Sequence, residues 1–195
     1  MKKVLGILGS PRRGGNTEIL LDEALKGANS AGAGIEKLSL ADMEFKGCTE
    51  CGGCCQTGEC ILMDDLAPVY EKVRNADVLI LASPIFFAGV TAQLKAMIDR
   101  FQAEWVAKYV LKKRKAKSEK RKTSKSGAFI CVGGHKDKKF YEPARATIDI
   151  FFKTLDIGFS EELFFGGVEK AGGIRTQKGA LDEVYKLGQR IVKGG

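Results

Sequence analysis

The alternation of two kinds of apolar segment constrains the fold of this chain more than any other feature. The first kind is short and almost continuously apolar, as strands buried on both faces of a parallel sheet are; it covers residues 3–8, 35–40, 78–82, 128–132 and 163–165. The second kind has apolar residues at helical spacing; it covers residues 19–31, 66–76, 92–111, 140–155 and 180–192. Five strands alternating with five helices predict a doubly wound α/β fold, with helices on both faces of a five-stranded parallel sheet. In such folds ligands bind at the carboxyl ends of the strands.

The chain has the length of one domain. Its 195 residues contain no internal repeat, so we expect residues 1–195 to form a single domain. No apolar run approaches the roughly 20 residues of a membrane span, and the apolar run after Met1 is too short for a secretion signal. We therefore expect a cytoplasmic protein without membrane contact, whose cysteines stay reduced.

The net charge of +8 comes from one stretch, a basic excursion at residues 104–126. This stretch holds ten basic and two acidic residues, a net of +8, so the rest of the chain is neutral. The simplest interpretation is a solvated loop. Steering of an acidic partner protein, or of the phosphates of a ligand, is the second interpretation. Nucleic acid is an unlikely partner because the chain has no recognition module.

The first predicted strand runs into a glycine-bearing turn, residues 9–17, and a helix follows. Such a turn directs backbone N–H groups and the positive end of the helix dipole at one point, where phosphate binds. Side chains in the turn add hydrogen-bond donors: Ser10, Arg12, Asn16 and Thr17. The turn lacks the Gly-x-Gly-x-x-Gly and Walker patterns, which disfavours a dinucleotide fold and a nucleotide triphosphatase. The alternative is a surface turn with solvated arginines.

The third predicted strand ends at Ser83-Pro84, where proline withholds a hydrogen-bond donor. The residues that follow can lie against a flat apolar ring system, and Gly89 lets the backbone approach it. Backbone N–H groups there can bond the polar edge of such a ring system. The competing interpretation is an aromatic pair, Phe86 and Phe87, that caps the core.

These two motifs together resemble the NADPH-dependent FMN reductase and iron-sulfur flavoprotein family. The resemblance rests on residues 9–17, residues 83–95 and the pair Asp99-Arg100, and it extends from Lys2 to about Gly167. It implies a flavodoxin-like sheet in strand order 2-1-3-4-5 that binds FMN. It places the FMN phosphate on Ser10, Arg12, Asn16 and Thr17, and the ring system beside Ser83, Pro84, Ile85, Phe86, Phe87, Ala88 and Gly89. By position, Gly133 and Gly134 correspond to the family's other flavin-contacting loop. Family members often carry Tyr where Phe86 stands, so any role of that hydroxyl is absent here.

Five of the six cysteines lie within residues 48–60, at positions 48, 51, 54, 55 and 60. A run this compact favours a four-iron (4Fe-4S) cluster. Zinc competes for sulfur ligands, but structural zinc sites usually place two cysteine pairs well apart. The iron-sulfur members of the family carry a Cys-x2-Cys-x2-Cys-x4-7-Cys motif, and this resemblance assigns Cys48, Cys51, Cys54 and Cys60 as metal ligands. Cys55 in place of Cys54, and cysteines that hold no metal, stay open.

The resulting expectation is an FMN-binding oxidoreductase of the iron-sulfur flavoprotein type. Electrons would pass from ferredoxin or NAD(P)H, through the cluster and FMN, to a small acceptor. A cluster-free NAD(P)H-dependent FMN or quinone reductase and a non-enzymatic electron carrier are the alternatives. No catalytic acid or base is identifiable.

Phe101, Trp105 and Tyr109 recur every four residues. They pack in the core or form a subunit interface, and the family's assemblies imply a homodimer or homotetramer.

Overall fold

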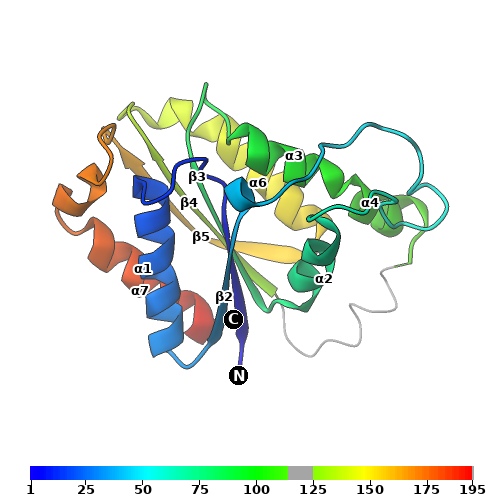
Figure 1. The fold of residues 1–195 in the computed structure, drawn as a ribbon. Helices are drawn as coiled ribbons and strands as arrows, with labels where there is room; N and C mark the ends of the chain where they lie inside the picture. Colours follow the sequence, from blue (N-terminus) through cyan, green and yellow to red (C-terminus); the bar gives the residue numbers. More distant parts are fainter. Residues whose placement is uncertain (114–124, 195) are drawn as a thin grey trace.

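The structure is a computed structural model that describes residues 1–113 and 125–194. In this part of the chain one five-stranded sheet has the order β2-β1-β3-β4-β5 (Figure 1). Every neighbouring pair of strands is parallel. The strands are β1 (Lys3–Leu8), β2 (Gly34–Ser39), β3 (Val78–Pro84), β4 (Lys125–Gly133) and β5 (Ile157–Gly166). The predicted flavodoxin-like fold and its strand order are confirmed.

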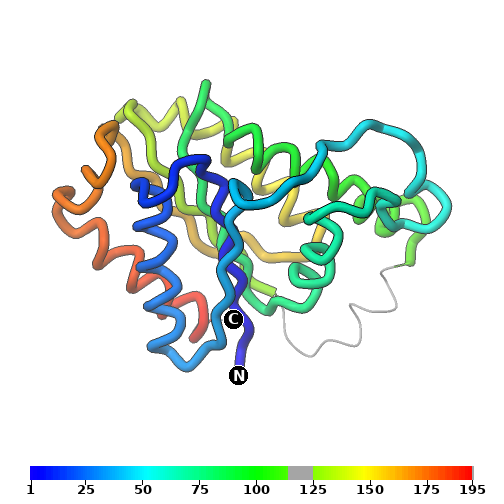
Figure 2. The backbone as a smooth tube through the Cα atoms, in the orientation of Figure 1, coloured from blue at the N-terminus to red at the C-terminus, as the bar shows by residue number. Residues whose placement is uncertain are grey.

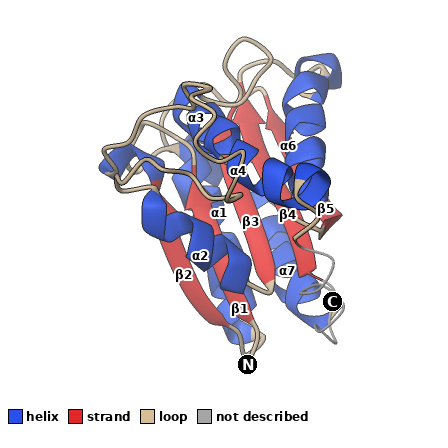
Figure 3. Cartoon of the chain, turned by 90° about the vertical axis from the view of Figure 1, so that its right-hand side faces the viewer, coloured by secondary structure: helices blue, strands red, loops and turns tan. Residues whose placement is uncertain are grey.

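Helices cover both faces of the sheet (Figures 1 and 3). One face carries α1 (Asn16–Ser30) and α7 (Ala180–Lys193); the other carries α2 (Ala67–Asn75), α3 (Ala92–Arg100), α4 (Gln102–Trp105) and α6 (Glu142–Thr154). Short helical segments are η1 (Leu40–Asp42), the π-helix η2 (Val106–Val110), η3 (Lys138–Phe140) and η4 (Gly173–Thr176). Along β3, Ile80 packs toward α1 and α7, whereas Leu79 and Leu81 pack toward α2, α3 and α6. Because both faces are buried, β3 is apolar from Val78 to Ala82.

Two predicted elements differ most from the structure. The helix expected over residues 92–111 is divided: α3 ends at Arg100, α4 covers Gln102–Trp105, and the π-helix η2 follows. The Phe101 ring, between α3 and α4, is buried against Tyr70 with the ring centroids 4.5 Å apart. The last strand, expected over residues 163–165, is β5 with ten residues. An edge strand alternates between buried and exposed side chains, as β5 does, so its full length is hidden from a search for continuous apolar runs. Of the basic excursion, residues 114–124 lie outside the described part of the chain.

Helices α1 and α7 touch through their backbones at two glycines. A Cβ atom on Gly27 would lie 2.0 Å from the carbonyl oxygen of Tyr185, and one on Gly188 would lie 2.0 Å from the carbonyl oxygen of Ala24. Real Cβ atoms do not approach backbone atoms this closely. The glycine pair therefore sets how α1 lies on α7, and with it the direction in which the N-terminus of α1 points.

We predict that Gly27→Ala destabilises the protein by about 1–3 kcal/mol, although alanine is normally the better helix former. The added methyl group must push α1 away from α7. Urea denaturation followed by circular dichroism measures the change. Gly158→Ala is the control, since its Cβ would be 3.5 Å from the nearest atom, and we expect a change within about 0.5 kcal/mol. Equal effects of the two substitutions would contradict the contact.

Candidate functional site

Three turns meet at the carboxyl edge of the sheet: residues 9–17 after β1, residues 83–91 after β3 and residues 133–137 after β4. Strands β1, β3 and β4 are neighbours, so their carboxyl ends lie side by side. Thr91 joins the first two turns: its Oγ1 donates to the Gly9 carbonyl at 2.5 Å, and its N–H donates to Ser83 Oγ at 3.2 Å. The third turn joins them where the Ile85 N–H donates to the Val132 carbonyl at 2.9 Å. The structure thus brings together the residues that the sequence predicts for a cofactor site.

The turn before α1 uses the Gly14 N–H, which donates to Glu18 Oε2 at 2.6 Å, but it leaves the start of the helix itself without a cap. The N-cap residue of α1 is Gly15, and no side chain caps the helix. Arg13 forms an ion pair with Asp42, whereas the Arg12 side chain makes no hydrogen bond or ion pair with the described residues. Ser10 is buried, and its hydroxyl accepts from the Arg12 N–H at 3.2 Å. An uncapped helix N-terminus with a free guanidinium beside it can bind a phosphate.

The side chain of Asn16, which the resemblance places on the FMN phosphate, bonds the loop between β5 and α7 in the structure. Its amide donates to the Lys170 carbonyl at 2.8 Å and accepts from the Ile174 N–H at 3.3 Å. Asn16 therefore holds the loop between β5 and α7 against the start of α1. Sequence reasoning missed this loop because its partners are more than 150 positions apart in the chain. It also missed Thr91, although a threonine directly before a helical pattern is a signature of a helix N-cap.

The turn after β3 is a strained two-residue hairpin. The Phe86 N–H donates to the Gly89 carbonyl at 3.0 Å, and the Gly89 N–H donates to the Phe86 carbonyl at 2.8 Å. Between them Phe87 has φ 48° and Ala88 has φ 62°, a left-handed conformation that costs roughly 1–3 kcal/mol per residue without glycine. Phe87 is fully exposed and Phe86 is half exposed, so these aromatics do not cap the core. The turn offers a flat apolar ring an exposed surface together with the free N–H groups of Phe87 and Ala88.

The five clustered cysteines lie on a long loop far from these turns in the backbone trace, the cyan loop of Figure 2. The loop packs on the α3–α4–η2 helices: a Cβ on Gly58 would lie 2.7 Å from the Cβ of Ala107. Cys48, Cys51 and Cys55 are exposed, and Cys54 and Cys60 are partly buried. Burial raises the pKa of Cys54, as do the neighbouring thiols of Cys55, Cys48 and Cys60. Among residues 1–113 and 125–194, no three Cys, His, Asp or Glu side chains are arranged to hold a metal ion.

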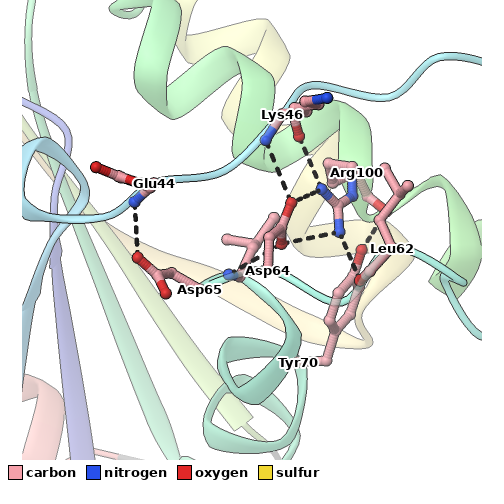
Figure 4. A network of polar contacts seen from close by, with 8 residues as sticks. Glu44, Lys46, Leu62, Asp64, Asp65, Tyr70 and Arg100 are labelled. Atoms are coloured by element: carbon pink, nitrogen blue, oxygen red, sulfur yellow. Dashed lines mark hydrogen bonds and ion pairs between the residues drawn. The ribbon is translucent and has the colours of Figure 1, made fainter.

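Arg100, at the end of α3, holds both ends of the cysteine loop (Figure 4). Its Nη1 donates to the Lys46 carbonyl at 2.8 Å and to Asp64 Oδ2 at 2.7 Å. Its Nη2 donates to the Leu62 carbonyl and to Asp64 Oδ1, both at 3.3 Å. The side chain is 1% exposed, so this is a buried, bidentate ion pair. We call Arg100 and Asp64 the clamp, because Lys46 precedes the first cysteine and Leu62 follows the last.

The clamp also changes the ionisation of its members. Burial raises the pKa of Asp64, but the hydrogen bonds from Arg100 and from the N–H groups of Lys46 and Leu66 outweigh it, so the pKa is lowered. Burial lowers the pKa of Arg100, and the hydrogen bonds to Asp64 more than reverse this. Both groups stay charged at neutral pH. Asp64 does not cap the helix that follows: the N-cap residue of α2 is Leu66, without a side-chain cap.

An open groove of about 580 Å³ runs beside the clamp. Its lining consists of Met43, Glu44, Phe45, Lys46, Leu62, Met63 and Asp64. None of these residues belongs to the three turns at the sheet edge, so the groove is separate from the predicted cofactor site.

Comparison with protein-family models matches residues 2–140 to the NADPH-dependent FMN reductase family. The match includes all three turns and the cysteine loop. The chain belongs to this family. The sequence-based expectation of that family is confirmed. In the described part of the chain no helix has both the length and the apolar character needed to cross a membrane.

Relatives add detail to this assignment. An iron-sulfur flavoprotein of Methanocaldococcus jannaschii is 46% identical over 98 residues, 50% of this chain and 51% of the relative. A second one from the same organism is 35% identical over 151 residues, 77% of this chain and 70% of the relative. The chain thus spans about half the length of the first of these relatives. The solved NAD(P)H:quinone oxidoreductase from Methanothermobacter marburgensis has the same fold, with a TM-score of 0.71 at 19% identity, over 97% of this chain and 96% of that one.

We predict that Asp64→Asn destabilises the protein by about 3 kcal/mol, because it leaves the Arg100 charge buried without a partner. Since folding lowers the Asp64 pKa, the stabilisation is present at neutral pH. It disappears as the pH falls below about 4, where the unfolded-state carboxyl becomes protonated. Urea denaturation at pH 7 and pH 3 measures both effects. Asp182→Asn, which removes the exposed pair with Lys186, should cost less than about 1 kcal/mol. A similar cost for both variants at pH 7 would contradict the clamp.

Proposed function

We propose that this protein is an FMN-dependent oxidoreductase that carries a cysteine-bound four-iron cluster on the loop held by the clamp. The observation that carries the FMN site is the strained turn at Phe87 and Ala88, next to the uncapped N-terminus of α1. Backbone strain is typical of functional sites, where the surrounding structure maintains it for a ligand. When bound, FMN supplies both hydride and single-electron chemistry, so it can accept two electrons from NAD(P)H or single electrons from ferredoxin.

The residues at the sheet edge suit the two halves of FMN. Arg12, Ser10 and Thr17, with the free N–H groups of α1, would hold the phosphate. The turn from Ser83 to Gly89 would support the ring system, with the N–H groups of Phe87 and Ala88 available to its polar edge. Gly133 lets the third turn pack closely on the turn after β3, since its Cβ would be 3.3 Å from the Cβ of Ile85. The nearby Asn16 would act by fixing the loop after β5.

The cysteine loop suits a cluster by the chemistry of its donors, since thiolates are the ligands of iron-sulfur centres. Cys54 lies near the thiols of Cys48 and Cys60 and packs partly against the core, whereas Cys55 is exposed. We therefore assign Cys48, Cys51, Cys54 and Cys60 as the ligands. Gly52 and Gly58, with φ 73° and 72°, give the loop the tight turns that a compact cluster requires.

A cluster-free NAD(P)H-dependent FMN or quinone reductase is the second candidate. It is favoured by the separation of the thiols, which form no metal-binding group within the described residues.

We also propose a homodimer or homotetramer in which Trp105 and Tyr109 contact another copy. These rings lie 5.5 Å apart and are 42% and 48% exposed, while Phe101 is in the core. An acidic partner such as ferredoxin and a small-molecule acceptor complete the proposal.

The phosphate assignment predicts opposite outcomes for two neighbouring arginines. Arg12→Ala should weaken FMN binding about 10- to 100-fold, the worth of one hydrogen bond to a charged group, and leave riboflavin binding unchanged. Arg13→Ala should weaken FMN binding less than about fivefold, because Arg13 is exposed and paired with Asp42. Flavin fluorescence quenching measures the four dissociation constants. Equal losses of FMN and riboflavin affinity in Arg12→Ala would show that Arg12 does not contact the phosphate.

The cluster assignment predicts different iron contents for two neighbouring cysteines. After anaerobic reconstitution with iron and sulfide, Cys55→Ser should retain the wild-type iron content, whereas Cys54→Ser should lose most of it, because a serine hydroxyl is a poor ligand for iron-sulfur clusters. Iron and sulfide analysis with the visible spectrum gives the result, and NAD(P)H oxidation is measured in parallel. Wild-type protein that oxidises NAD(P)H without taking up iron would establish the cluster-free reductase.

A further inference from the structure

Arg100 has one polar group that the clamp does not use. Its Nη1 and Nη2 atoms donate to Lys46, Leu62 and Asp64, but its buried Nε has no hydrogen-bond partner among the described residues. A buried N–H without a partner is rare in native proteins and calls for an explanation. The same guanidinium bonds the carbonyls of Lys46 and Leu62 at the two ends of the cysteine loop.

The cysteine that the fold brings toward this end of Arg100 is Cys60. Cys60 lies two residues before Leu62, whose carbonyl accepts from Arg100 Nη2 at 3.3 Å, and its partly buried side chain packs on the core that contains Tyr70 and Phe101. The Tyr70 hydroxyl donates to the Arg100 carbonyl at 2.6 Å, so the end of α3 is fixed against the same core. A neutral thiol is a weak acceptor, whereas a thiolate accepts a strong, charge-assisted hydrogen bond from a guanidinium.

We propose that Arg100 is a positioning residue for the metal centre, whose Nε–H donates to the Cys60 sulfur once that sulfur is a metal-bound thiolate. This inference rests on the proposed function in that it assumes a thiolate-bound metal. It goes further because it makes Cys60 the fixed ligand, around which the exposed Cys48 and Cys51 close. Arg100 then holds the ends of the loop through its Nη atoms and orients one ligand through Nε.

The arrangement has an electronic consequence. A hydrogen bond to a ligating sulfur withdraws negative charge from the metal centre and raises its reduction potential. Partners that hydrogen-bond to metal ligands typically account for about 10- to 100-fold in metal affinity. Lysine keeps the positive charge but lacks the planar fork, so it cannot bond Asp64, both carbonyls and a sulfur at once.

The test uses Co²⁺ as the probe metal, added anaerobically to the full chain. Arg100→Lys should weaken Co²⁺ binding about 10- to 100-fold and move the thiolate-to-cobalt charge-transfer band to lower energy, with FMN affinity unchanged. Arg190→Lys is the control, because Arg190 also makes two hydrogen bonds to one carboxylate, from Nε and Nη2 to Glu161 at 3.0 and 2.9 Å, on the other face of the sheet. An Arg100→Lys protein with wild-type Co²⁺ affinity and band position would overturn the inference.

Reconstitution with iron and sulfide separates this inference from the cluster proposal. If wild type takes up iron, the midpoint potential of the cluster should be lower in Arg100→Lys, which loss of loop rigidity alone would not cause. If wild type takes up no iron but binds Co²⁺ with the same dependence on Arg100, the cluster proposal fails and the inference stands. If neither metal binds wild type, the inference is wrong.

A measurement on wild-type protein covers the case in which Arg100→Lys does not fold. In ¹⁵N-labelled protein, the Arg100 Nε–H resonance should shift downfield when Zn²⁺ is added, because the proton enters a hydrogen bond to a thiolate. The Arg190 Nε–H, already bonded to Glu161, is the internal control and should not move. A Zn²⁺-saturated protein in which the Arg100 resonance keeps its position would overturn the inference.

Discussion

The buried pair of Arg100 and Asp64 is the interaction on which the cysteine region depends. Residues 43–66 contain neither helix nor strand, and loops of this length in compact domains are uncommon and usually functional. Closing such a loop costs conformational entropy, and burying two charges costs solvation. Four hydrogen bonds from one guanidinium, two to the carboxylate and two to backbone carbonyls, offset these costs. The planar fork of arginine makes this set of bonds, which a lysine ammonium cannot reproduce.

Helix α3 connects the clamp to the predicted flavin site. It begins at Ala92, next to the turn that contains Phe87, and ends at Arg100. With a rise of about 1.5 Å per residue, its nine residues separate the two sites by roughly 13 Å. Thr91 fixes the first end of α3, because its hydroxyl accepts from the Leu94 N–H and donates to Gly9. A short helix held at both ends therefore places the cysteine loop relative to the sheet edge.

The parts of the molecule that follow from local patterns were predictable from the sequence. Strand β1 has the predicted bounds because a strand buried on both faces is apolar throughout. The glycine turn and the Ser83-Pro84 turn were recognisable because strand ends and helix starts have local signatures. The contacts of Asn16 with Lys170, and of Arg100 with Lys46, join residues 154 and 54 positions apart. No short-range pattern marks such pairs. The left-handed Phe87 and Ala88 were equally hidden, since their sequence carries none of the glycine or asparagine that usually marks this turn.

The core does not end where the family match ends. The match stops at residue 140, but α6 begins at Glu142 and β5 pairs with β4 along its length. Strand β4 is buried from Ser126 to Val132 because β5 pairs along it, α6 packs on one face, and α1 and α7 pack on the other. A chain cut at residue 140 would present β4 as a bare apolar edge, which is a template for pairing between molecules. We therefore expect a chain truncated at residue 140 to aggregate through β4, and not only to lose stability.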